Sequence, residues 1–158
     1  MKQYLPYPTQ LGMAVSRTEP PLDAETPPIE LLVVDDNPAE TLLMLYALEE
    51  YKRPLKFHFA KDGAEALQML SERTFDLVIL DLNLPKLSGH GVLKQCDPTR
   101  FPVVVFSVSP DEADARQVLE LGAREFVRKP IELQAYKKAV VQMITKWVPN
   151  RSPNAAGA

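Results

Sequence analysis

Short apolar runs alternate with longer segments of helical period through the middle of the chain. Residues 77–80 and 103–106 are apolar at every position, which is typical of strands buried on both faces of a sheet. The strands that this pattern predicts are residues 29–34, 55–60, 75–80, 102–107 and 124–127. Because helical segments separate them, we expect a parallel sheet with helices on both faces, as in a doubly wound α/β fold.

Five helices are predicted between and after the strands. The first is expected to begin at Asn37, since an asparagine cap followed by Pro38 is a common helix start. The others are expected after Gly63, from Gly89 to before Asp97, over residues 109–122 and over residues 131–147. The side chains expected to face the core are Leu42, Leu43, Tyr46 and Ala47 in the first helix and Leu133, Tyr136, Val140, Ile144 and Trp147 in the last.

Length and composition indicate one globular domain with a tail at each end. The chain has 158 residues, of which 46% are hydrophobic and 25% charged. Residues 1–28 are rich in proline and are expected to form a disordered tail, although the apolar side chains near Tyr4 and Leu11 leave a docking segment as an alternative. We therefore expect the folded domain over residues 29–148 and a flexible tail over residues 149–158.

Charge and cysteine content restrict the partners and the compartment. The net charge of -3, without a stripe of lysine or arginine, argues against direct binding of nucleic acid. The single cysteine, Cys96, cannot form an internal disulfide, which favours a reducing compartment. No apolar run suits a signal peptide or approaches the roughly 20 residues of a membrane span, so the sequence predicts a cytoplasmic protein without a membrane contact.

Carboxylates follow two of the predicted strands. Asp35 and Asp36 come directly after residues 29–34, and Asp81 comes directly after residues 75–80. In a doubly wound sheet, ligands bind beyond the carboxyl ends of the strands, near the point where the strand order reverses. Acids so close together resist ionisation unless a cation neutralises them, and oxygen-only ligands favour Mg²⁺. The sequence therefore predicts a magnesium site at this edge.

A hydroxyl and a cation follow the last two strands. Ser107 ends the fourth predicted strand, and Lys129 follows the fifth. Phosphoryl transfer depends mainly on positioning and on neutralising the phosphoryl oxygens. An ionised aspartate as nucleophile, a metal ion and these two donors are sufficient for that reaction.

These motifs together resemble the receiver domains of two-component response regulators, over about residues 29–148. The matching motifs are Asp35-Asp36, Asp81-Leu82-Asn83-Leu84-Pro85, Ser107 and Lys129-Pro130. The resemblance implies a flavodoxin-like fold with strand order 2-1-3-4-5. It also implies that Asp81 accepts a phosphoryl group from the phosphohistidine of a sensor histidine kinase.

The resemblance implies a role for each residue of the magnesium site. Asp36, Asp81 and the backbone carbonyl of Asn83 would bind Mg²⁺ directly, and Asp35 would bind it through water. As a separate hypothesis, we expect Asn83 and Ser109 to lie near the water that later hydrolyses the acyl phosphate.

The resemblance also implies how phosphorylation is read out. Ser107 and Lys129 would contact phosphoryl oxygens, and the peptide bond before Pro130 would be cis. Phe126 matches the aromatic residue that moves inward when the hydroxyl of Ser107 turns toward the phosphoryl group. The fourth helix, fifth strand and fifth helix would then form a face with two states.

The length of the chain favours a stand-alone regulator that signals by protein contact rather than a turnover enzyme. The Asn83-Leu84-Pro85-Lys86 segment and the last helix also resemble small regulators paired with bacteriophytochrome-type light sensors. The downstream partner is not identified by the sequence, and the last helix with the fifth strand permits a homodimer.

Other interpretations stay open at this stage. Asp35 and Asp36 alone could be simple helix caps. A hydrolase of the haloacid-dehalogenase type also uses a strand-end aspartate, but it needs a second acid where this chain has Asn83. A phosphate-independent interaction module and an intermediate carrier in a phosphorelay are the remaining alternatives.

Overall fold

The computed structural model describes residues 26–108 and 111–149, and its centre is a five-stranded parallel sheet. The strand order is β2-β1-β3-β4-β5, as the resemblance implied. The strands are β1 (Ile29–Val34), β2 (Leu55–Ala60), β3 (Leu77–Leu80), β4 (Val103–Ser107) and β5 (Glu125–Arg128). The predicted doubly wound fold is therefore confirmed.

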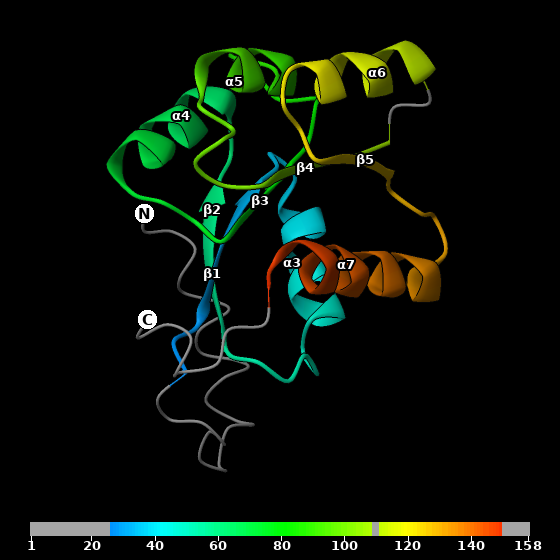
Figure 1. Cartoon of the computed structure of the whole chain (residues 1–158). Helices are drawn as coiled ribbons and strands as arrows, with labels where there is room; N and C mark the ends of the chain where they lie inside the picture. Colours follow the sequence, from blue (N-terminus) through cyan, green and yellow to red (C-terminus); the bar gives the residue numbers. More distant parts are fainter. Residues whose placement is uncertain (1–25, 109–110, 150–158) are drawn as a thin grey trace.

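Five helices of the described residues cover the two faces of the sheet. They are α3 (Pro38–Ala47), α4 (Gly63–Glu72), α5 (Gly89–Gln95), α6 (Glu112–Glu120) and α7 (Leu133–Trp147). Figure 1 shows α3 and α7 on one face and α4, α5 and α6 on the other. Each helix begins with a side chain that accepts a backbone hydrogen bond in the first turn, as Asn37 does from the amide of Ala39 at 3.0 Å.

Alternate residues of the central strands enter two separate cores. In β1, Leu32 and Val34 pack with α4, α5 and α6, whereas Leu31 and Val33 pack with α3 and α7. β3 and β4 are buried at every position, which explains why their sequences are continuous apolar runs. Burial of each such aliphatic side chain contributes about 1.5–3 kcal/mol to folding.

Several predicted boundaries and orientations were wrong. The third and fourth strands begin later than predicted, since pairing starts at Leu77 and Val103, and the fifth spans Glu125–Arg128 instead of residues 124–127. In α3, Leu42 and Tyr46 are 51% and 48% exposed, because the helix turns Met44 and Ala47 toward the core.

The first turn of α7 also differs from the prediction. Leu133, the first residue of the helix, is exposed, whereas Tyr136, Val140 and Ile144 of the following turns are buried. The predicted tails, residues 1–28 and 149–158, lie almost wholly outside the described residues and stay predictions.

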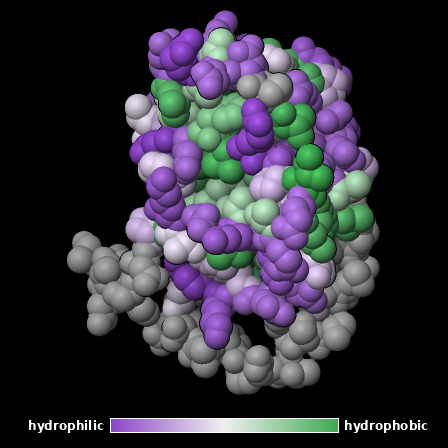
Figure 2. Space-filling view, turned by 90° about the vertical axis from the view of Figure 1, so that its right-hand side faces the viewer, coloured by the Kyte–Doolittle hydropathy of each residue, from purple (hydrophilic) through white to green (hydrophobic). Residues whose placement is uncertain are grey.

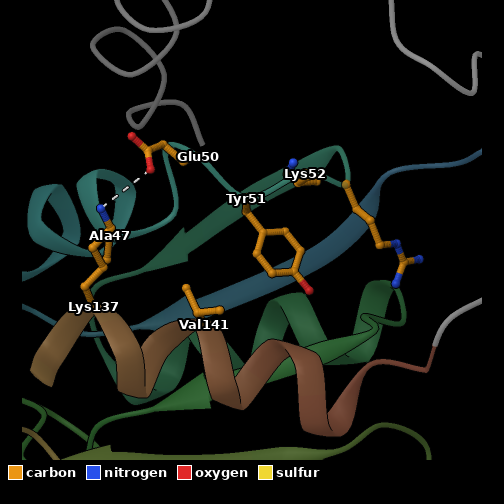
Figure 3. Close-up of a pocket in the computed structure, with 7 residues that line it drawn as sticks. Ala47, Glu50, Tyr51, Lys52, Lys137 and Val141 are labelled. Carbon is orange, nitrogen blue, oxygen red and sulfur yellow. Dashed lines mark ion pairs between the residues drawn. The ribbon is translucent and has the colours of Figure 1, made fainter. Parts of the chain in front are cut away.

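A groove of about 410 Å³ lies between the end of α3 and the outer side of α7 (Figure 3). Tyr51 and Val141 line it, and Lys137 of α7 faces Glu50 across it with 3.9 Å between Nζ and Oε1. This groove adjoins the beginning of β2, whereas the predicted site lies beyond the carboxyl ends of the strands. It is therefore separate from that site.

Candidate functional site

The parallel pairing of β1 with β3 brings Asp35 and Asp81 to the same edge of the sheet. Val34 is in register with Leu80, so the residues that follow them are neighbours, and the amide of Asp81 donates to the carbonyl of Val34 at 3.0 Å. Carboxylate oxygens of Asp35, Asp36 and Asp81 all lie within 4.8 Å of one another. Asp81 is buried and Asp36 is exposed, so the cluster opens toward solvent.

Lys129 reaches this cluster from the end of β5. Its Nζ lies 2.8 Å from Oδ2 of Asp35 and 3.5 Å from Oδ2 of Asp81, and its side chain is only 7% exposed. The amide of Lys129 donates to the carbonyl of Ser107 at 2.9 Å, which fixes the start of the side chain beside β4.

The expected cis bond before Pro130 is wrong, since every described peptide bond is trans. Trans is the more stable form of a bond before proline by about 0.5–1 kcal/mol. The ammonium group of Lys129 reaches the acids with this trans bond.

Ser107 lies beneath the predicted acceptor. It is completely buried, and its Oγ donates to Oδ1 of Asp81 at 2.9 Å. The amide of Asn83 approaches the same oxygen at 3.3 Å. One oxygen of Asp81 is thus held by donors, and the other faces Lys129, which orients the carboxylate for a reaction.

The other residues that were predicted for the site are Phe126, Asn83 and Ser109. Phe126 is half-buried, lies in register with Val105 of β4 and packs against the core on the α4, α5 and α6 side. Asn83 is exposed beside Asp81. Ser109 lies outside the described residues.

Two residues of the site were missed by the sequence analysis. Oε1 of Glu40, in the first turn of α3, lies 3.3 Å from Nζ of Lys129, and the hydroxyl of Tyr136 donates to the same oxygen at 3.4 Å. An acid in a first helical turn is common because it complements the helix dipole, so the sequence carried no signal for this contact. Tyr136 was predicted only as a core residue.

Burial and charge oppose each other in this site. Burial raises the pKa of Asp35 above its usual range, even though Lys129 and the amide of Asn37 stabilise the carboxylate. Burial alone would lower the pKa of Lys129, but Asp35, Asp81 and Glu40 together outweigh it and raise that pKa. A carboxylate that resists ionisation inside a cluster of three acids fits a hard divalent cation, which would relieve the repulsion. The cluster can therefore bind a divalent metal ion.

These contacts predict a loss of stability at alkaline pH in metal-free protein. Burial first, and then the charge of Glu40, raise the pKa of Tyr136 above its ordinary value of 10.0, and the pKa of Lys129 is raised above 10.5. Both groups therefore keep protons in the folded state that the unfolded chain releases. The contribution of these two protons to the free energy of unfolding is fully present below pH 10. Above pH 10 the free energy of unfolding falls by about 1.4 kcal/mol per pH unit for each retained proton.

Urea unfolding at a series of pH values checks this prediction. Above pH 10, Tyr136→Phe is expected to reduce the slope of the free energy of unfolding against pH by the equivalent of one proton. Tyr46→Phe, at an exposed tyrosine, is expected to keep the wild-type slope. Equal slopes for Tyr136→Phe and wild type would contradict the assignment.

No helix in the described ranges, 26–108 and 111–149, has the length and apolar character that a membrane span requires.

Comparison with known proteins gives one consistent family. Residues 31–141 match the model of the response regulator receiver domain. The probable methanogenesis regulatory protein FilR2 of Methanothrix harundinacea is 33% identical over 146 residues, which are 85% of this chain and 94% of that protein. The chain spans about half the length or less of several other curated relatives, which are named as transcriptional regulators.

Solved structures of response regulators share the fold. The phosphorylated cyanobacterial phytochrome response regulator RcpA has a TM-score of 0.71 and 30% identity, covering 80% of this chain and 98% of RcpA. The Mn²⁺-bound form of response regulator Rcp1 has a TM-score of 0.71 and 27% identity, covering 79% of this chain and 98% of Rcp1. With matching sequence motifs, sheet order and acidic cluster, the chain belongs to the response regulator receiver domain family.

Proposed function

We propose that Asp81 is the acceptor for a phosphoryl group from the phosphohistidine of a sensor histidine kinase. The observation that carries this proposal is the position of its carboxylate, between the Ser107 hydroxyl at 2.9 Å and the Lys129 ammonium at 3.5 Å. With Asp35 and Asp36 it forms a cluster of carboxylates that are close enough to share one metal ion. The resident ion is proposed to be Mg²⁺.

The reaction needs no separate general base. An oxygen of the ionised Asp81 forms a bond to phosphorus while the bond between phosphorus and the imidazole nitrogen breaks, and the electron pair stays on that nitrogen. Lys129 and Ser107 are placed to donate to phosphoryl oxygens. A bound Mg²⁺ would neutralise charge between the carboxylates and the phosphoryl group. Asp36, Asp81 and the carbonyl of Asn83 would hold it directly, and Asp35 through water.

The readout is proposed to begin at Ser107. Its hydroxyl now donates to Asp81, and donation to a phosphoryl oxygen would require it to turn outward. Phe126, half-buried beside β4, would then move inward, and the face formed by α6, β5 and α7 would change. Hydrolysis of the acyl phosphate, with Asn83 and Ser109 near the water, would reset the switch.

A protein partner is the proposed output. Figure 2 shows hydrophobic areas among hydrophilic ones on the side of the molecule where α6 and α7 begin. Exposed apolar side chains include Val108 and Ile131, which follow β4 and β5 at the carboxyl edge of the sheet, and Leu119 near the end of α6. Similarity to RcpA supports a phytochrome-type kinase, and the β5 and α7 face is proposed for a homodimer. A cytoplasmic location completes the proposal.

Incubation with acetyl phosphate and Mg²⁺, followed by intact-protein mass spectrometry, tests this function. We expect the mass of one phosphoryl group to be added, and we expect chelation of the metal with EDTA to prevent it. No gain under either condition would favour a phosphate-independent interaction module. Passage of the group to a histidine phosphotransfer protein would identify a phosphorelay carrier instead.

A further inference from the structure

Lys129 is shared among three carboxylates, and one of them has no part in the proposed reaction. Its Nζ lies 2.8 Å from Asp35, 3.3 Å from Glu40 and 3.5 Å from Asp81. Glu40 is thus nearer to the ammonium group than the acceptor is. Glu40 therefore competes for the ammonium group that must contact the incoming phosphoryl group.

Glu40 does not act as an ordinary cap of α3. It occupies the third position after the cap Asn37, from which a glutamate commonly accepts a hydrogen bond from the amide of the cap residue. Here that amide donates to Oδ1 of Asp35 at 2.9 Å. The side chain of Glu40 instead extends to Lys129.

Tyr136 fixes the position of Glu40. Its hydroxyl donates to Oε1 of Glu40 at 3.4 Å, and its side chain is 2% exposed in the core between α7 and the sheet. The ring packs against Phe106, the residue before Ser107, with 5.3 Å between the ring centres. Because the side chain of Tyr136 is fixed by this packing, its hydroxyl restricts the position of the Glu40 carboxylate even though Glu40 is partly exposed.

We propose that Glu40, anchored by Tyr136, is a positioning residue that competes with Asp81 for Lys129 and slows phosphoryl acceptance. This inference rests on the proposed function. Two physical effects act in the same direction. The Glu40 carboxylate competes for the ammonium group, and its charge would repel an anionic phosphoryl group brought to Asp81.

The same contacts link the acceptor to α7. Lys129, Glu40 and Tyr136 form a continuous chain of polar contacts from the carboxyl edge of the sheet to the first turns of α7. A partner that shifts α7 would change how firmly Glu40 holds Lys129. The rate of phosphoryl acceptance would then depend on what is bound to that helix.

Replacing Glu40 by glutamine separates charge from shape. Glu40→Gln is expected to accept a phosphoryl group from acetyl phosphate about threefold to tenfold faster than wild type, because one partly exposed charge beside the reacting anion is removed. Glu49→Gln, at an exposed glutamate just beyond the end of α3, carries the same change in net charge and is expected to match wild type. Equilibrium binding of beryllofluoride, a phosphoryl mimic, is expected to tighten by a similar factor in Glu40→Gln only.

A double-mutant cycle with Tyr136→Phe provides the second readout. Tyr136→Phe alone is expected to accelerate acceptance less than Glu40→Gln, and to add almost nothing in the Glu40→Gln background. Thermal unfolding confirms that each variant is folded. Equal or slower acceptance by Glu40→Gln, or independent effects of the two changes, would overturn the inference. Absence of phosphorylation in wild type would instead overturn the proposed function.

Discussion

Asp81→Asn is expected to abolish phosphoryl incorporation from acetyl phosphate in the presence of Mg²⁺. Asparagine keeps the shape of the side chain and can still accept the Ser107 hydrogen bond, but its amide is not a nucleophile. It also removes one of the three acids that approach within 4.8 Å of one another, so weaker binding of Mg²⁺ is expected as well. Intact-protein mass spectrometry measures the incorporation.

Asp97→Asn is the matched control for Asp81→Asn. Asp97 is an exposed aspartate after α5 that accepts hydrogen bonds from Thr99, outside the acidic cluster. The control is expected to incorporate as much phosphoryl group as wild type. A full mass gain in Asp81→Asn would place the acceptor at another residue and refute the proposed mechanism.

Gly89→Ala is expected to destabilise the fold by about 2–3 kcal/mol, the cost of forcing extra atoms into a packed region. A Cβ at this position would lie 2.5 Å from the carbonyl oxygen of Asp81 and 2.8 Å from Cα of Leu82. Both are backbone atoms, and the amide of Gly89 also donates to the carbonyl of Leu82 at 3.0 Å. The backbone of the acceptor must therefore move, and slower phosphoryl acceptance should accompany the loss of stability.

Gly91→Ala, in the same helix, is the comparison that isolates this effect. Its added Cβ would meet the end of the Leu87 side chain, which can rotate away. Alanine is favoured over glycine inside a helix by about 1 kcal/mol, so this variant is expected to be as stable as wild type or slightly more stable. Urea unfolding measures both changes, and equal stabilities for the two variants would contradict the steric argument.

The sequence predicted the fold because two of its patterns have a direct physical meaning. The short, continuous apolar runs of β3 and β4 are typical of strands covered on both faces, and the helical segments between the strands supply the covers. Asp35, Asp36 and Asp81 could be placed together because carboxyl ends of adjacent parallel strands share one edge.

Other features depend on contacts between distant segments. Leu42 and Tyr46 are exposed because of how α3 is rotated about its axis against the sheet. The sequence of α3 does not specify this rotation, because it has hydrophobic residues on several sides of the helix. The contact between Glu40 and Lys129 joins residues far apart in the chain and depends on the same packing. The roles of Ser107 and Phe126 in a switch concern a second state of the molecule, and they stay predictions.

After β1 and after β3 the chain continues to opposite faces of the sheet, which affects how a phosphoryl donor would reach Asp81. The chain leaves β1 for α3 on one face of the sheet and leaves β3 for α5 on the other (Figure 1). The groove beside α3 and a second one between β5 and α7 are lined by none of the clustered acids. Asp36 is exposed at this edge, so a phosphoryl donor would approach Asp81 from solvent and would contact the protein surface around the cluster. That surface, rather than the acids themselves, would then distinguish one donor protein from another.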